Sequence, residues 1–188
     1  MNQILEAAVE VERVVRTARF PFCFIGGVAV QRWGQPRMTA DIDLTVITGF
    51  GTEDRYVDVL LASLRGRVAD ARSFALRHRT LLLVASNGVH IDVSLGAMPF
   101  EERSVKRASL FKISDSDSIT TCSAEDLVVY KAFAGRDKDW GDICSKRQTR
   151  RRMRRVRRLA TVVDYSEPRN ATRSAFSCLV KLIANRSS

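Results

Sequence analysis

Two aspartates separated by one residue, Asp41 and Asp43, are the side chains of this sequence best suited to metal-dependent chemistry. They stand in the stretch Asp-Ile-Asp-Leu-Thr-Val, whose alternating apolar residues predict a β-strand entered from Thr39. Residues i and i+2 of a strand point to the same face, so both carboxylates would lie at one sheet surface while Ile42 and Leu44 face the core. Adjacent carboxylates of this kind can hold two divalent ions about 3.5–4 Å apart, as in phosphoryl or nucleotidyl transfer. The alternative is a pair of acids at a strand edge that cap neighbouring backbone.

A pair of glycines precedes this strand and predicts a tight turn. Residues 22–25 form a short apolar run typical of a strand, and Gly26-Gly27 follow it directly. Residues 28–33 then predict a short helix that ends at Gly34. The amides of Gly26 and Gly27, together with the amino terminus of the helix, could cradle a triphosphate. A tight turn with no ligand is the other interpretation.

A third carboxylate, Asp92, lies in a predicted hairpin. Asn87-Gly88 is a strong turn signal, and it joins strand-like residues 80–85 to residues 89–95. The apolar residues of the second strand fall on one face and Asp92 on the other. If this strand pairs beside the one that carries the aspartate pair, three carboxylates converge. Otherwise Asp92 is a solvent-facing strand residue.

The Asp-x-Asp pattern occurs twice more in the sequence and so has little weight by itself. Asp115 and Asp117 stand in a Ser/Asp-rich turn, and Asp137 and Asp139 stand in a polar segment between helices. We interpret both later pairs as solvated. Only the first pair is flanked by strand-type apolar residues and preceded by a strand–Gly-Gly–helix unit.

Three further polar residues are candidates for phosphate contacts. Arg37 and Thr39 immediately precede the aspartate pair, and Lys131 lies in a downstream helical segment. For each residue the alternative is ordinary, since a surface arginine, a strand-leading threonine and a solvated helix lysine are common.

Taken together, these motifs carry a family resemblance. The chain reads Gly-Gly-x-Ala at 26–29, Arg-x-Thr-x-Asp-x-Asp-Leu at 37–44 and Ile-Asp-Val at 91–93. This combination resembles the nucleotidyltransferase superfamily of DNA polymerase β. More narrowly, it resembles small bacterial nucleotidyltransferases related to abortive-infection toxins of type IV toxin–antitoxin systems. Residues 123–143 also resemble the downstream helical segment of those proteins.

The resemblance implies an α+β fold, with a nucleotidyltransferase-like mixed β-sheet flanked by helices and followed by a helical C-terminal segment. It implies Mg²⁺-dependent transfer of a nucleoside monophosphate from an NTP to a hydroxyl of an RNA end, a protein or a small molecule. Two Mg²⁺ ions are expected, with Mn²⁺ as a substitute. The expected metal ligands and catalytic residues are Asp41, Asp43 and Asp92, and the expected nucleotide-binding residues are Gly26, Gly27, Arg37, Thr39 and Lys131.

Composition is that of a globular protein. The chain has 188 residues, which is long enough for one domain with a hydrophobic core. Of these residues, 45% are hydrophobic and 28% are charged. We expect an α/β core over 1–122 and a helical segment with an Arg-rich tail over 123–188. Four scattered cysteines favour reduced thiols over a zinc site. With no signal peptide or apolar run of spanning length apparent, we expect a cytoplasmic protein without a membrane partner.

The net charge of +10 is concentrated near the C-terminus. Residues 1–143 contain 18 Lys/Arg and 19 Asp/Glu, whereas residues 144–188 contain 13 Lys/Arg and 2 Asp/Glu. The tail could bind nucleic-acid backbone, dock onto an acidic partner, or be a solvated helix face. The alternative to an enzyme is therefore a non-catalytic protein of the same fold that binds RNA or an acidic partner through this tail.

The remaining elements follow from apolar spacing and capping signals. Helices are predicted over 2–19, 53–64 (with Thr52 as N-cap), 99–107 and 124–134, and strands over 72–78, 109–113 and 118–121.

Overall fold

The computed structural model describes residues 2–34 and 38–134. The chain divides into two compact units, Met1–Ser123 and Ala124–Ser188. All strands of the described residues belong to the first unit, and they form one sheet in the order β3-β4-β5-β2-β1-β7-β6. The strands are β1 (Phe22–Phe24), β2 (Asp41–Ile47), β3 (Arg65–Gly66), β4 (Thr80–Val84), β5 (His90–Gly96), β6 (Ser109–Lys112) and β7 (Ser118–Thr121).

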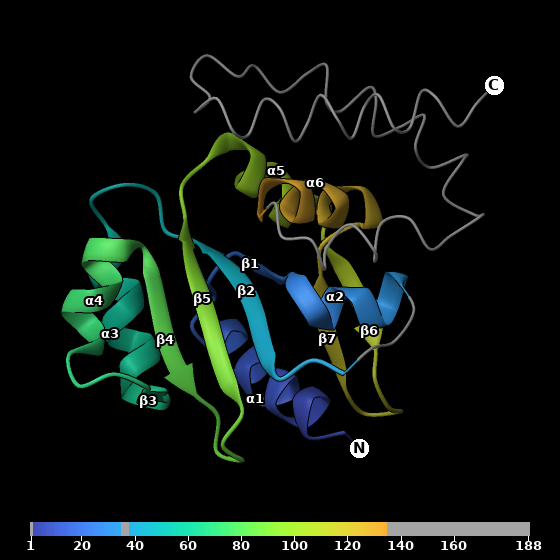
Figure 1. Cartoon of the computed structure of the whole chain (residues 1–188), viewed down its shortest axis with the longest axis horizontal. Helices are drawn as coiled ribbons and strands as arrows, with labels where there is room; N and C mark the ends of the chain where they lie inside the picture. The colour runs from blue at the N-terminus through green and yellow to red at the C-terminus, as the bar shows by residue number, and fades with distance from the viewer. Residues whose placement is uncertain (1, 35–37, 135–188) are drawn as a thin grey trace. The chain divides into compact units, whose positions relative to one another are not determined.

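The sheet is mixed. Strand β2 runs parallel to β5, and β1 runs parallel to β7, while the other neighbouring pairs are antiparallel. The helices are α1 (Gln3–Thr17), α2 (Gly26–Trp33), α3 (Glu53–Ser63), α4 (Ala71–His78), α5 (Pro99–Arg107) and, in the second unit, α6 (Ala124–Ala134). Figure 1 shows α2 in front of the sheet and α1 behind it. The expected α+β fold with a mixed sheet between helices is confirmed.

Side chains alternate along the two central strands, so that one face of the sheet is apolar and buried and the other is polar. Ile42, Leu44 and Val46 of β2 are fully buried, as are Ile91 and Val93 of β5. All five belong to one hydrophobic core, which also contains apolar side chains of α1 and α3. Because side chains alternate along a strand, the intervening residues of β2 and β5 face the other side of the sheet.

Helix α4 corrects one prediction. Residues 72–78 were expected to form a strand with Phe74 and Leu76 buried, but Ala71–His78 is a helix. Asp70 caps it by accepting a hydrogen bond from the amide of Ser73 at 3.1 Å. Ala71 and Ala75, four residues apart, are the buried positions, so the helical period governs this segment.

Other predicted elements agree with the structure to within a few residues. The 87–88 turn joins β4 to β5, with Gly88 at a φ of +84° and the Ala85 amide donating to the Val89 carbonyl at 2.9 Å. Thr52 does precede α3, but no side-chain hydrogen bond caps that helix. Its hydroxyl donates instead to the Thr48 carbonyl at 2.5 Å. No helix in the described ranges is long and apolar enough to cross a membrane.

Candidate active site

The register between β2 and β5 places Asp43 directly beside Asp92. The same parallel pairing sets Asp41 beside His90. Residues paired across neighbouring strands project from the same face of a sheet, so all three carboxylates lie on the polar face. Asp41 is exposed, whereas Asp43 and Asp92 are half-buried. The register therefore places the three acidic residues on one face of the sheet, as expected if β5 pairs beside β2.

The beginning of α2 lies against Asp43. Strand β1 runs antiparallel to β2, and the Ile25 amide continues this pairing by donating to the Asp43 carbonyl at 2.9 Å. Gly26 follows with a φ of +56°, and a Cβ atom at this position would stand 1.9 Å from Asp43 Oδ2. No other residue could bring the backbone this close to the carboxylate.

Gly27 makes an equally close approach to Thr39. A Cβ atom on Gly27 would stand 2.3 Å from Thr39 Oγ1. That hydroxyl lies 3.1 Å from the Asp41 carbonyl and 3.3 Å from Asp41 Oδ1, as a donor to each. Thus both glycines pack against the segment that leads into and carries the aspartate pair.

The amino terminus of α2 has no side-chain cap. The first amides of a helix have no intrahelical acceptor and form the positive end of the helix dipole. Gly26 and Gly27 supply the first of these amides. This end of α2 is therefore suited to an anionic ligand such as a phosphate, beside the aspartates.

Helix α5 limits the site along β2. Thr45 lies on the same face of β2 as Asp41 and Asp43 but is fully buried, and its hydroxyl donates to Glu101 of α5 at 3.4 Å. Cys23 Sγ lies 3.9 Å from Ser104 Oγ of the same helix. The polar face is thus covered at Thr45 and accessible at Asp41.

Asp92 has an ionic partner that sequence reasoning missed. Arg67 Nη2 lies 2.9 Å from Asp92 Oδ1. Arg67 directly follows β3, a two-residue strand too short to leave a periodic signal, and its amide donates to the Leu82 carbonyl. Since Leu82 is the partner of Asp92 in the β4–β5 pairing, the arginine side chain reaches the carboxylate across β4.

The carboxylates are divided between two environments. Among residues 2–34 and 38–134, no three His, Cys, Asp or Glu side chains are grouped so that they could hold a metal ion together. Asp41 and Asp43 still offer hard oxygen ligands of the kind that Mg²⁺ prefers. The buried Oδ1 of Asp92, moreover, has no hydrogen-bonding partner within the described residues. Asp41 and Asp43 are therefore the residues that could hold Mg²⁺, while Asp92 is held by Arg67.

For two of the predicted nucleotide-binding residues, the described structure gives no position relative to this site. Arg37 lies outside the described residues, and Lys131 belongs to α6 in the second unit. Their roles stay predictions.

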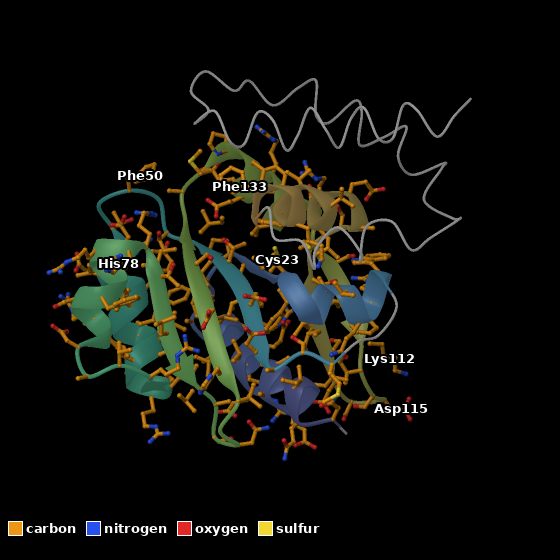
Figure 2. All side chains as sticks on the ribbon, viewed as in Figure 1. Cys23, Phe50, His78, Lys112, Asp115 and Phe133 are labelled. Atoms are coloured by element: carbon orange, nitrogen blue, oxygen red, sulfur yellow. The ribbon has the colours of Figure 1, made fainter. Side chains whose placement is uncertain are left out.

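The later Asp-x-Asp pairs were expected to be solvated. Asp115 is fully exposed and pairs with Lys112 at 2.8 Å. Both residues are labelled in Figure 2. Hydrogen bonds from Ser116, Arg13 and Ser114 lower the pKa of Asp117. Asp115 is therefore solvated as predicted, whereas the prediction is wrong for Asp117, whose side chain is 17% exposed and accepts hydrogen bonds from Arg13, Ser114 and Ser116. Asp137 and Asp139 lie outside the described residues.

Solved structures supply the comparison with known proteins. No protein-family model and no curated protein matches the sequence. The chain is similar to the crystal structure of an antigenic nucleotidyltransferase-like protein from Paracoccidioides brasiliensis, with 15% identity and a TM-score of 0.51 over 97% of this chain and 90% of that one. It also aligns with the solution structure of the antibiotic-resistance factor ANT(2'')-Ia, at 12% identity and a TM-score of 0.44 over 95% and 93% of the two chains. The chain has a nucleotidyltransferase-like fold.

Proposed function

We propose that this protein is a Mg²⁺-dependent nucleotidyltransferase that transfers a nucleoside monophosphate from an NTP to a hydroxyl acceptor. The observation that carries the proposal is the position of Asp43, packed against Gly26 at the start of α2 and paired in register with Asp92. Asp43 thus lies both beside the helix terminus proposed to bind phosphate and next to the other carboxylates of the sheet.

Each residue of the site has a proposed role. Asp41 and Asp43 hold two divalent ions, with Asp92 as a further ligand and as acceptor of the proton from the attacking hydroxyl. When bound, Mg²⁺ neutralises triphosphate charge and favours the ionised acceptor oxygen. The α2 amides at Gly26 and Gly27 bind phosphate oxygens, supported by Thr39, Arg37 and Lys131.

The reaction is an in-line displacement at phosphorus. The acceptor oxygen forms a bond to the α-phosphorus of the NTP, and the bond from that phosphorus to the bridging oxygen breaks, releasing pyrophosphate. Residues preorganised around the developing negative charge supply the main catalytic effect. The α2 terminus meets this requirement, since its amides are fixed by the helix before any substrate binds.

A transfer assay tests the proposal. The full chain is incubated with labelled NTPs, Mg²⁺ or Mn²⁺, and a cell extract that offers RNA, protein and small-molecule acceptors. Asp43→Asn is the test variant, and Asp115→Asn is the matched control, because Asp115 is an exposed acid of an Asp-x-Asp pair in a turn. We expect label transfer by the parent and by Asp115→Asn, and a loss of at least about 100-fold in Asp43→Asn.

Other outcomes separate the alternatives. Equal labelling by the parent and Asp43→Asn would reject the assigned role of Asp43. RNA retention that falls steeply with salt, without label transfer, would favour a binding protein that acts through the basic residues 144–188.

A toxin–antitoxin or phage-defence role is proposed from the motif resemblance. Induced expression of the parent chain should then arrest growth, and expression of Asp43→Asn should not. Growth arrest by both proteins would separate toxicity from nucleotidyl transfer.

A further inference from the structure

The ion pair between Arg67 and Asp92 is half-buried. The side chains are 25% and 34% exposed, and Nη2 lies 2.9 Å from Oδ1. An ion pair at this depth is less screened by water than one at the surface, so it constrains where the Asp92 carboxylate lies.

This contact is ionic without being a well-formed hydrogen bond. The Asp92 Oδ1 atom is buried and accepts no hydrogen bond in the described part of the chain. A charge-assisted bond of good geometry is roughly twice as strong as a neutral hydrogen bond, and this pair lacks that gain. Arg67 therefore neutralises the charge of Asp92 but leaves its buried oxygen open to a better partner.

Neighbouring negative charge explains why Asp92 needs a cation. Asp43 is its register partner on β2, and Asp41 lies two residues before Asp43 on the same face. Like charges on adjacent strands repel one another. A guanidinium beside Asp92 relieves this repulsion when no divalent ion does, but the same positive charge opposes the entry of a metal ion.

We infer that Arg67 takes the place of a metal ion beside Asp92 in the metal-free protein. When a divalent ion binds, the Asp92 carboxylate exchanges the Arg67 guanidinium for that ion, and we call this the stand-in role of Arg67. This inference rests on the proposed function, because it takes Asp92 as a metal ligand. Arg67 is a positioning residue in this scheme. It holds the Asp92 carboxylate in place in the metal-free protein.

Direct titration of the full chain with Mn²⁺, followed by electron paramagnetic resonance of the free ion, tests the inference without measuring activity. Arg67→Gln removes the competing charge, so we expect Mn²⁺ to bind roughly threefold to tenfold more tightly than to the parent. Arg65→Gln is the matched control, because Arg65 carries the same charge on β3 and has no ion pair within the described residues. Its effect should be less than about twofold.

A second background isolates the contact. In Asp92→Asn there is no carboxylate for Arg67 to hold, so adding Arg67→Gln should change Mn²⁺ affinity no more than Arg65→Gln does. Thermal unfolding gives an independent readout. Arg67→Gln should lower the melting temperature without metal and show a larger upward shift with Mn²⁺ than the parent does.

Each contrary result overturns a distinct claim. Weaker or unchanged Mn²⁺ binding by Arg67→Gln would overturn the stand-in role, and the metal site would survive provided that Asp43→Asn still reduces binding. Equal Mn²⁺ binding by the parent and Asp43→Asn would instead reject the metal site of the proposed function. No Mn²⁺ binding by any variant would reject both.

Discussion

A Cβ atom on Gly26 would stand only 1.9 Å from Asp43 Oδ2. The first residue of α2 and a half-buried acid of β2 thus occupy positions that exclude any side chain between them. Gly26 also has a φ of +56°, in the region that L-residues adopt at a cost. The glycine is required twice, for its backbone conformation and for the space beside the carboxylate.

Gly26→Ala should therefore damage both stability and the site. We expect a loss of about 2–4 kcal/mol in unfolding free energy, from backbone strain together with displacement of Asp43. Mn²⁺ binding and label transfer should fall with it. Urea unfolding and Mn²⁺ titration measure the two effects separately.

Gly51→Ala is the control for strain alone. Gly51 has a φ of +78°, but a Cβ atom there would meet nothing within 4 Å. Gly51→Ala should lower the unfolding free energy by about 1–2 kcal/mol and leave the Mn²⁺ affinity unchanged. If the two alanine variants lost the same stability and the same metal affinity, the close approach to Asp43 would have no consequence.

Gly27→Ala tests the second contact of the glycine pair. Its Cβ would lie 2.3 Å from Thr39 Oγ1, so Thr39 must move and its contact with Asp41 must break. We expect a loss of about 1–3 kcal/mol from overpacking. Thr39→Gly removes the three atoms that lie nearest to the new Cβ.

A double-mutant cycle in urea measures this coupling. The unfolding free energy lost by Gly27→Ala should be smaller in the Thr39→Gly background, by about 0.5–2 kcal/mol. Strict additivity of the two substitutions would show that Gly27 does not depend on Thr39.

The sequence predicts the core of the candidate site well, because local patterns determine it. Alternation in β2 and β5 assigns Asp43 and Asp92 to the polar face, and the 87–88 turn fixes where β5 begins. Pro99 at the first position of α5 marks the start of a helix that matches its predicted bounds. Each of these features depends on residues only a few positions apart.

The contacts of Arg67 and the nature of α4 depend on tertiary context. Arg67 meets Asp92 only because β4 lies between β3 and β5, which no local pattern around an Arg-Gly-Arg sequence reveals. In α4, Phe74 and Leu76 alternate as they would in a strand, yet burial of Ala71 and Ala75 and the Asp70 cap favour the helix. Small buried residues give a weak sequence signal, so the larger apolar ones misled the prediction.

Glu12 should be a major contributor to stability away from the site. Its carboxylate is 4% exposed and joins α1 to β7. It accepts hydrogen bonds from Arg16 Nε at 2.5 Å and from the Thr120 amide and hydroxyl, each at 2.9 Å. Glu12→Ala leaves the Thr120 amide without its acceptor and should lower the unfolding free energy by about 2–4 kcal/mol.

Glu10→Ala is the matched comparison on the same helix. Glu10 accepts from the Ser86 amide at 3.1 Å and the Ser86 hydroxyl at 2.6 Å in an exposed environment, where water can replace it. Its loss should be about 1 kcal/mol or less. Chemical denaturation of both variants measures the two losses in unfolding free energy. A larger loss for Glu10→Ala than for Glu12→Ala would contradict the importance of burial.

The cap of α4 should make stability depend on pH in the acid range. Hydrogen bonds from the side chain and the amide of Ser73 lower the pKa of Asp70 below its ordinary value. A lowered folded-state pKa means that ionised Asp70 adds stability above its unfolded-state pKa, near 3.9, and that this stability is lost as pH falls through the folded-state value. Asp70→Asn can still cap the helix but has no proton to bind.

The difference in unfolding free energy between the parent and Asp70→Asn should therefore be constant above about pH 5 and change in favour of the variant below about pH 4. Urea unfolding at a series of pH values measures this difference. Ser73→Ala removes the side-chain donor but keeps the amide at 3.1 Å, so it should raise the pKa of Asp70. The unfolding free energy of this variant should then fall less between pH 5 and the acid range than that of the parent. A difference that moved in favour of the parent as the pH fell would mean that Asp70 is protonated more readily in the folded chain, and the cap would then be wrongly assigned.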